Sequence, residues 1–423
     1  MNFPKLAIGL AAAACCATAA AQSSDSEGDA LGLVSAPDAP AAATPAPFKL
    51  MLEAAAGVAD RRSTGGTAGV RRLSVDLYRA GRLAPGWRYV VSDRIDHVRP
   101  ADGGLPDTVN SLREAYVGWD AGDGASSLEF GRINLRQGTG YGYNPTDFFR
   151  DGSLRTVTSL NPFSQRENRL GVVMLRGQRT WAGSSVALAF APKLADSRSS
   201  DGTSLDLGAT NNRDRWLLSA SRQISERVNA QALLYKETGQ GVQLGASATA
   251  LIGTATVAHA EWAHGRQSSL ADMAGGSSGG EKAGHRYAFG LTYTTAGKLS
   301  VTGELQGNDF ALADAGWAAA GGAAQRGAYL LTAEQRQDLA SRRAALVYLT
   351  QKDLLGVRNL LLSAFVRFNT IDHSRLHWAE LRYQWPSIDM AVQWQRSSGG
   401  ALDQWGLMPD RQVVQAVATY HFR

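Results

Sequence analysis

The stretch Gln412-Val-Val-Gln-Ala-Val-Ala-Thr-Tyr-His-Phe-Arg423 ends the chain and has the two-residue period of a β-strand. Polar side chains at Gln415, Thr419 and His421 share one face. The opposite face is apolar and consists of Val414, Ala416, Ala418, Tyr420 and Phe422. An unpaired apolar strand invites aggregation, whereas in a closed barrel the last strand pairs with the first. The ending therefore predicts a β-barrel in a membrane.

Similar alternation recurs from residue 48 onward, in about 18 segments of about 10 residues, the length that a tilted strand needs to cross a bilayer. The fifth of these segments is 126–136. Eight connections are short: 81–85, 120–125, 179–183, 224–226, 251–253, 296–297, 351–356 and 385–386. Five are long: 137–167, 193–213, 265–283, 309–340 and 397–411. This alternation of short turns and long loops predicts an all-β fold, a single antiparallel transmembrane β-barrel over residues 48–423, with the long loops outside the cell.

The composition agrees with a barrel. Hydrophobic residues make up 44% of the 423 positions, yet no apolar run after the N-terminus reaches the roughly 18 residues that a membrane helix needs. The lack of such a run excludes a helical membrane protein. It does not exclude a barrel, because a barrel distributes its apolar residues by alternation. The 46 glycines suit turns, and the 10 tryptophans suit the edges of a membrane.

The N-terminus has the features of a secretory signal. Lys5 precedes an apolar core at 6–14, and three alanines at 19–21 supply a small-residue cleavage site. We expect a signal peptide at 1–21 and a disordered periplasmic leader, rich in Ala, Pro, Asp and Ser, at 22–47. The alternative is lipoprotein processing at Cys15. Both cysteines, Cys15 and Cys16, lie in the signal, so a cleaved chain has no disulfide scaffold, thiolate metal site or cysteine nucleophile.

Two segments resemble known outer-membrane proteins. Residues 415–422, with aromatic side chains at Tyr420 and Phe422, resemble the terminal strand of outer-membrane porin-type barrels. Residues 131–149 contain a Gly-Arg, Gly, Asn-Pro-x-Asp pattern that is similar to porin-like families related to alginate-export channels. The resemblance implies the outer membrane of a Gram-negative-type cell envelope, contact with outer-membrane lipid, and assembly by the barrel-assembly machinery through the C-terminal strand.

Alternation also predicts which charged side chains face the lumen, because an arginine facing lipid near the bilayer midplane costs about 2–4 kcal/mol. Seven of the 43 basic residues are lysine, which leaves 43 − 7 = 36 arginines. Two interpretations remain open: the guanidinium groups bind an anionic solute, or they form a self-neutralising ladder of ion pairs. The predicted pore-lining residues are Arg72, Asp76, Arg88, Arg94, Asp96, Arg215, Arg286, Glu304, Arg367, Glu380 and Arg382.

Connection 137–167 is the candidate constriction loop. Long loops without regular structure are usually functional or disordered, and this one is rich in aromatic and turn residues. It either folds into the lumen or shapes the external surface. We expect another long loop, 309–340, to lie on the surface. The predicted constriction residues are Arg136, Tyr141, Tyr143, Asn144, Asp147, Phe149, Arg150 and Arg155.

The sequence gives no support for catalysis. It contains no His-Glu-x-x-His, Gly-x-Ser-x-Gly or P-loop motif, and its 7 histidines are scattered. We therefore expect no enzyme activity, no metal, no cofactor and no nucleic-acid partner. The predicted function is a porin-like channel for small hydrophilic solutes, including anionic ones. The alternatives are an exporter of an anionic polysaccharide and a plugged, non-conducting surface barrel.

Overall fold

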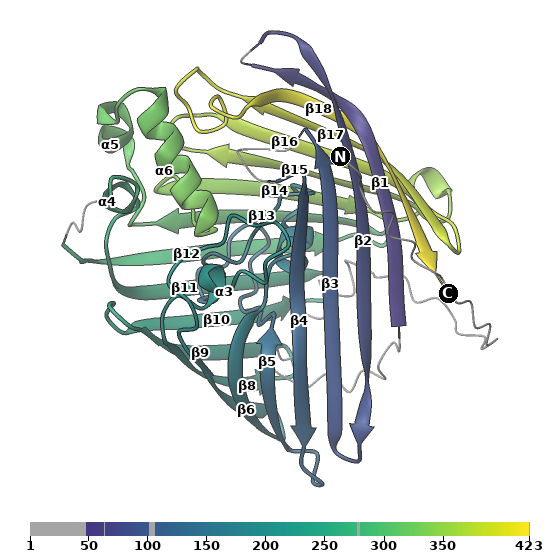
Figure 1. Cartoon of the computed structure of the whole chain (residues 1–423), viewed down its shortest axis with the longest axis vertical. Helices are drawn as coiled ribbons and strands as arrows, with labels where there is room; N and C mark the ends of the chain where they lie inside the picture. Colours follow the sequence, from purple (N-terminus) through teal and green to yellow (C-terminus); the bar gives the residue numbers. More distant parts are fainter. Residues whose placement is uncertain (1–47, 63, 101–105, 277–279, 423) are drawn as a thin grey trace, which may run out of the picture.

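The computed structural model describes residues 48–422 except 63, 101–105 and 277–279, and within them the chain forms one antiparallel barrel (Figure 1). The signal peptide and leader expected at 1–21 and 22–47 lie outside the described residues. The barrel has 18 strands, as the sequence predicts. They are β1 (Phe48–Arg61), β2 (Thr67–Ala84), β3 (Trp87–Arg99), β4 (Thr108–Asp120), β5 (Ser126–Ile133), β6 (Val172–Trp181), β7 (Ser184–Ala191), β8 (Arg215–Ser225), β9 (Val228–Glu237), β10 (Gln243–Ile252), β11 (Thr256–Gln267), β12 (Lys282–Thr294), β13 (Leu299–Asn308), β14 (Arg343–Gln351), β15 (Leu360–Asn369), β16 (Arg375–Gln384), β17 (Ile388–Ser398) and β18 (Asp410–Phe422).

The last strand closes the barrel. β18 pairs with β17 on one side and with β1 on the other, and the β1–β18 register runs from Leu50 opposite Phe422 to Arg61 opposite Asp410. Every other strand pairs with its neighbours in sequence. Closure leaves no unpaired edge, which is the condition for a sheet to cross a bilayer. The barrel fold predicted from the chain end is confirmed.

Alternation along each strand separates an apolar outer face from a mixed inner face. On β8, the outward Trp216 and Leu218 are 46% and 42% exposed, whereas Leu217 between them is 2% exposed. The same pattern on the other strands gives the barrel a lipid-facing apolar surface. Aromatic side chains gather at the end of the barrel with the short turns. They are Trp87, Trp119, Trp181, Tyr293, Trp385, Tyr420 and Phe422, all exposed. Such a belt is typical of a membrane–water interface.

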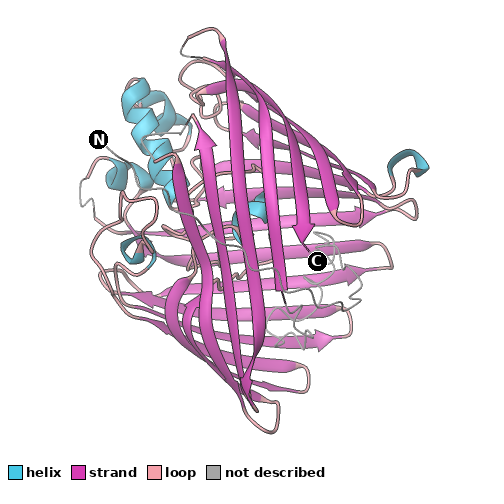
Figure 2. Ribbon diagram, turned by 45° about the vertical axis from the view of Figure 1, so that its right-hand side comes forward, coloured by secondary structure: helices cyan, strands magenta, loops and turns pink. Residues whose placement is uncertain are grey.

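The long connections lie at the opposite end and carry most of the helices (Figure 2). These helices are α2 (Pro162–Glu167), α3 (Leu207–Thr210), α4 (Leu270–Ala274), α5 (Asp314–Ala319) and α6 (Ala323–Gln335); a short 3-10 turn, η1 (Leu354–Gly356), lies in a connection at the other end. Within the described residues, no helix is long and apolar enough to span a membrane.

The strand predicted at 126–136 is too long, because β5 ends at Ile133. Beyond it, the amide of Asn134 contacts the far end of the same loop instead of a neighbouring strand. Its Nδ2 donates to the carbonyl of Arg166 at 3.2 Å, and its Oδ1 accepts from Nε of Arg169 at 2.8 Å. These contacts direct the chain away from the barrel wall and into the lumen.

Candidate functional site

The connection between β5 and β6, residues 134–171, folds into the barrel; we call it the inward loop. Most of the side chains from Gln137 to Arg150 are buried, including Tyr141 and Asp147. Loops that stay outside a barrel contact solvent, whereas the inward loop bonds to β11 and β13 on the opposite wall. It therefore crosses the lumen.

A single carboxylate on β11, Glu261, holds the first turn of the inward loop. It accepts hydrogen bonds from the backbone N–H groups of Thr139, Gly140 (2.5 Å) and Thr146 (3.3 Å). The Thr146 hydroxyl (2.7 Å) and the Asn144 amide (3.0 Å) also donate to it. Five donors around one buried carboxylate satisfy its lone pairs without a counter-ion, and charge-assisted hydrogen bonds of this kind are the stronger ones.

A second carboxylate, Glu304 on β13, holds the next two residues. It accepts from the backbone N–H of Tyr141 at 2.6 Å and of Gly142 at 3.0 Å. Two side chains of the wall complete its surroundings, Gln306 at 2.6 Å and Nε2 of His259 at 2.9 Å. Glu304 thus faces inward as predicted, but it anchors the inward loop instead of facing a passing solute.

Asp147 and Arg150 tie the inward loop to itself and to the long loop between β13 and β14. Both oxygens of Asp147 accept from Arg169, at 2.7 and 3.2 Å. Arg150 donates to Asp338 at 2.9 Å, and the Tyr143 hydroxyl donates to the same carboxylate. The prediction that loop 309–340 lies only on the surface is wrong, since Asp338 is buried inside the barrel mouth against the inward loop.

The three remaining predicted loop residues, Phe149, Arg155 and Arg136, lie in different surroundings. Phe149 is buried in an apolar cluster, with the guanidinium of Arg215 5.1 Å from its ring centroid. Arg155 donates to the carbonyls of Asn110 (2.8 Å) and Ser204 (2.7 Å), so it fastens the inward loop to β4 and to the loop between β7 and β8. Arg136 is exposed and lies 4.0 Å from the carboxylate of Glu167, outside the constriction. Its predicted place there is wrong, because its exposed side chain lies beside Glu167 and not among the buried contacts that hold the loop.

Predicted pore-lining charges on β2 and β3 form one ion-pair network with Glu53 of β1. Arg94 contacts three carboxylates, Glu53 at 2.8 Å, Asp96 at 3.0 Å and Asp76 at 3.4 Å. Arg72 shares Glu53 at 2.8 Å. Since the carboxylates and guanidinium groups neutralise one another, this part of the wall is a structural ladder.

Other predicted pore-lining residues are also paired within the wall. Arg88 contacts Asp120 at 3.0 Å and Glu129 at 2.5 Å. Arg382 donates twice to Glu380, at 2.8 and 3.0 Å. Arg286 donates to Gln243 at 2.5 Å and lies 3.9 Å from Asp338. All of these side chains face inward, as alternation predicts, and most of them support the self-neutralising interpretation.

Removing the central cation of the network should therefore affect stability. We expect Arg94→Ser to lower the free energy of unfolding by about 3–5 kcal/mol, because it leaves buried carboxylates without their partner. The matched control is Arg99→Ser, whose partner Asp107 is exposed, and its expected loss is below about 1 kcal/mol. Urea titration of the full chain in detergent measures both; equal losses would contradict a structural role for Arg94.

A cavity of about 780 Å³ lies between the inward loop, α6 and the inner face of β15 to β18. Arg166 of α2 and Arg367 of β15 both line it. Both donate to backbone carbonyls of the inward loop, Arg166 to Gln137 at 2.9 Å and Arg367 to Gly142 at 3.1 Å. Among the described residues, neither guanidinium forms an ion pair with a carboxylate, and the buried Nε of each has no hydrogen-bond partner. These two arginines therefore bring positive charge to the cavity without a direct ion pair.

An apolar and aromatic surface faces the same cavity. Tyr141, Leu376 and Trp378 belong to one buried cluster, and Trp405 and Met408 pack against it from the loop between β17 and β18. The cavity thus combines a positively charged side with an apolar side, the composition expected of a small-molecule site. Within the described residues, no group of three His, Cys, Asp or Glu side chains is placed to hold a metal ion.

No protein-family model matches the chain, and no curated protein matches it. Solved structures do match. Acinetobacter baumannii OccAB1 has a TM-score of 0.57 at 12% identity, covering 89% of this chain and 96% of that one. Pseudomonas aeruginosa OccK2 (OpdF), in complex with glucuronate, has 0.56 at 11% identity, covering 89% and 97%. A BenF-like porin from Pseudomonas fluorescens Pf-5 has 0.55 at 12% identity, covering 89% and 98%.

The fold is that of the porin-type β-barrels. At these identities the likeness extends to the fold alone, so the properties of the lumen must be argued from this chain's own residues.

Sequence reasoning missed four residues of the site. Glu261, Asp338, Arg166 and Arg169 all contact or belong to the inward loop. Alternation could have found Glu261, because it lies on the strand face opposite Trp262. The other three lie in the long connections, Arg166 within the short helix α2, where no strand periodicity indicates which way a side chain points.

Proposed function

We propose that this chain is an outer-membrane channel that passes small hydrophilic anions through a lumen narrowed by the inward loop. The observation that carries the proposal is the pair Arg166 and Arg367, two arginines that line the cavity without an ion-pair partner among the described residues. Guanidinium groups bind carboxylate and phosphate in a two-point geometry. A solute that carries such a group is attracted into the cavity, while its apolar part contacts Trp378 and Leu376.

Three further features support the outer-membrane setting and the size of the solute. The apolar outer surface and the aromatic belt suit a bilayer. A structurally similar barrel, OccK2, is solved with glucuronate, a small carboxylate. The inward loop occupies part of the lumen through its bonds to Glu261 and Glu304, which favours a small solute over a polysaccharide and leaves the relation to alginate-export channels a prediction.

The proposal extends to the route of the chain to the membrane. Residues 1–21 would direct secretion and be removed, 22–47 would form the periplasmic leader, and β18 would be the strand that the barrel-assembly machinery engages. No catalytic role belongs to this proposal.

Planar-bilayer recording of the full chain tests the function. We expect steady openings with a reversal potential that indicates preference for anions over cations in a KCl gradient. A folded barrel that conducts no ions would favour the plugged, non-conducting alternative. Cation preference would contradict the role of Arg166 and Arg367.

A further inference from the structure

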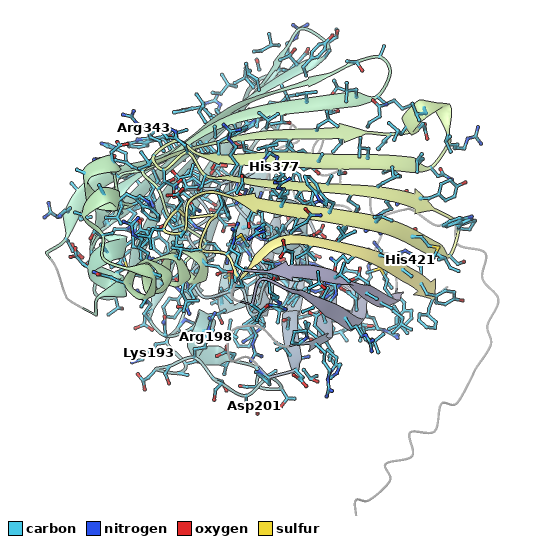
Figure 3. The ribbon with its side chains drawn as sticks, turned by 90° about the horizontal axis from the view of Figure 1, so that it is seen from above. Lys193, Arg198, Asp201, Arg343, His377 and His421 are labelled. Atoms are coloured by element: carbon cyan, nitrogen blue, oxygen red, sulfur yellow. The ribbon has the colours of Figure 1, made fainter. Side chains whose placement is uncertain are left out.

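A cluster of arginines lies on the outer face of the barrel, at the end with the long loops. We define this outer arginine cluster as Arg343 of β14, Arg375 of β16 and Arg396 of β17, all exposed. Their neighbours in sequence on the inner face, Leu376 and Ser397, are each 2% exposed, so alternation directs the arginines away from the lumen. In Figure 3, Arg343 lies toward the end that carries the helices, whereas His421 lies toward the opposite end.

The strand register places Arg375 between Arg343 and Arg396 on the same outer face. Arg375 is opposite Ser398 on β17, which makes Arg396 its diagonal neighbour, about 7–8 Å away along the sheet. On the other side, Thr370 of the turn after β15 donates to the carbonyl of Arg343 at 3.0 and 3.3 Å. Arg375 is level with Ala345 of β14, so it lies two strand spacings across and two residues along from Arg343, about 12 Å away. Arg343 and Arg396 are about 20 Å apart by the same register, so a single ligand that contacts all three arginines needs more than one anionic group.

The outer arginine cluster has no acidic partner. Among the described residues, none of the three guanidinium groups forms an ion pair with a carboxylate, in contrast to the paired arginines of the lumen network. The outward positions of β14 to β17 carry no Asp or Glu. Three cations gathered on one patch repel one another, so an anion that binds between them relieves this repulsion.

The surface next to the cluster is apolar and aromatic. The guanidinium of Arg375 lies 5.7 Å from the ring centroid of Phe368. His377, directly opposite Arg396, has its ring centroid 6.3 Å from that of Trp394. Toward the middle of the barrel, the same face continues in exposed Val347, Leu381 and Val392, which belong to the lipid-facing band. The cluster therefore lies at the boundary between hydrocarbon and headgroups.

We propose that the outer arginine cluster binds the phosphate groups of a phosphorylated glycolipid in the outer leaflet. Arginine forms two-point hydrogen bonds with phosphate, and basic residues beside a membrane surface attract anionic headgroups. A lipid fits better than free phosphate, since the cluster faces sideways into the bilayer and its acyl chains would cover the apolar band directly below. The proposal requires the barrel to lie in the outer membrane, but it does not require the lumen to conduct.

Native mass spectrometry of the full chain in detergent tests the proposal, with three probes: diphosphorylated lipid A, lipid A without phosphates, and inorganic phosphate. The test variant is Arg343→Gln/Arg375→Gln/Arg396→Gln. We expect it to bind diphosphorylated lipid A roughly 100-fold more weakly than the unaltered chain, since each basic residue near a membrane surface contributes about fivefold. The matched control is Arg79→Gln/Arg179→Gln/Arg222→Gln, which removes three outward arginines near the opposite end of the barrel, and it should bind as the unaltered chain does.

Each outcome supports or contradicts the proposal. The proposal is supported if the unaltered chain and the control prefer diphosphorylated lipid A and the cluster variant loses that preference. Equal binding of lipid A without phosphates, equal loss in the control, or equally tight binding of inorganic phosphate would overturn it. The cluster lies outside the lumen, so the test variant should keep the conductance of the unaltered chain; that measurement shows that the variant is folded and separates this proposal from the channel function.

Discussion

Exchange of both anchoring carboxylates, Glu261→Gln/Glu304→Gln, is expected to release the inward loop and raise the mean conductance of the barrel. Together the two carboxylates accept hydrogen bonds from five backbone N–H groups of the loop, those of Thr139, Gly140, Tyr141, Gly142 and Thr146. No other side chain of β11 or β13 offers the loop a negative charge. A glutamine presents an NH₂ group where the carboxylate presented an acceptor, so part of these bonds becomes repulsive.

The expected size of the effect follows from the bonds that are lost. A hydrogen bond to a charged group contributes about 1.5–3 kcal/mol, so the loss of even one raises the fraction of time that the loop is displaced by roughly tenfold. Single-channel recording should show longer or larger open levels. A variant with residues 138–166 replaced by a short glycine linker sets the upper limit of conductance.

The control for this experiment is Glu129→Gln/Glu380→Gln. It makes the same change of charge in two wall residues that pair with other wall residues, Arg88, Arg176, Arg382 and Gln393. If the control raises conductance as much as the anchoring variant, charge and not loop release is responsible. If the anchoring variant folds and gives wild-type traces, the inward loop does not limit the current.

The second large effect is expected from Arg166→Ser/Arg367→Ser, which should remove most of the preference for anions. Even at the dielectric constant of water, a unit charge 4 Å from an ion contributes about 1 kcal/mol, so the anion-to-cation permeability ratio should fall by roughly fivefold or more. The preference of the unaltered chain should itself be weaker in 1 M than in 0.1 M KCl, because the Debye length falls from about 10 Å to about 3 Å.

Two further variants complete this experiment. Arg166→Lys/Arg367→Lys keeps the charge and should keep the anion preference, although lysine loses the two-point geometry for a carboxylate. Arg179→Ser/Arg222→Ser removes the same charge from the outer face and should leave selectivity unchanged. An unaltered permeability ratio in the Arg166→Ser/Arg367→Ser variant would show that the cavity does not select the ion.

The structure also changes which arginines are worth testing for selectivity. By sequence, Arg94 and Arg367 are equivalent, since both are inward positions of alternating strands. In the folded chain Arg94 contacts three carboxylates, whereas Arg367 bonds to the carbonyl of Gly142. The first is part of the wall, and the second faces the cavity. Only the neighbouring strands and loops distinguish them.

The sequence by itself determined the barrel: the strands, their number, the closing role of β18 and the division into short turns and long loops. These properties follow from local patterns, because a two-residue period needs no knowledge of distant residues to separate a lipid face from a lumen face. Alternation likewise identified every predicted wall charge as inward-facing.

Only the tertiary structure decided what the lumen contains. Gly142 and Arg367 meet although they are 225 positions apart, and Thr139 meets Glu261 across 122 positions. Such contacts depend on the register of many strands and on the path of an irregular loop, neither of which has a periodic signal. The pairing of each charge was therefore invisible in the sequence, and with it the distinction between arginines that neutralise the wall and arginines that remain to meet a solute.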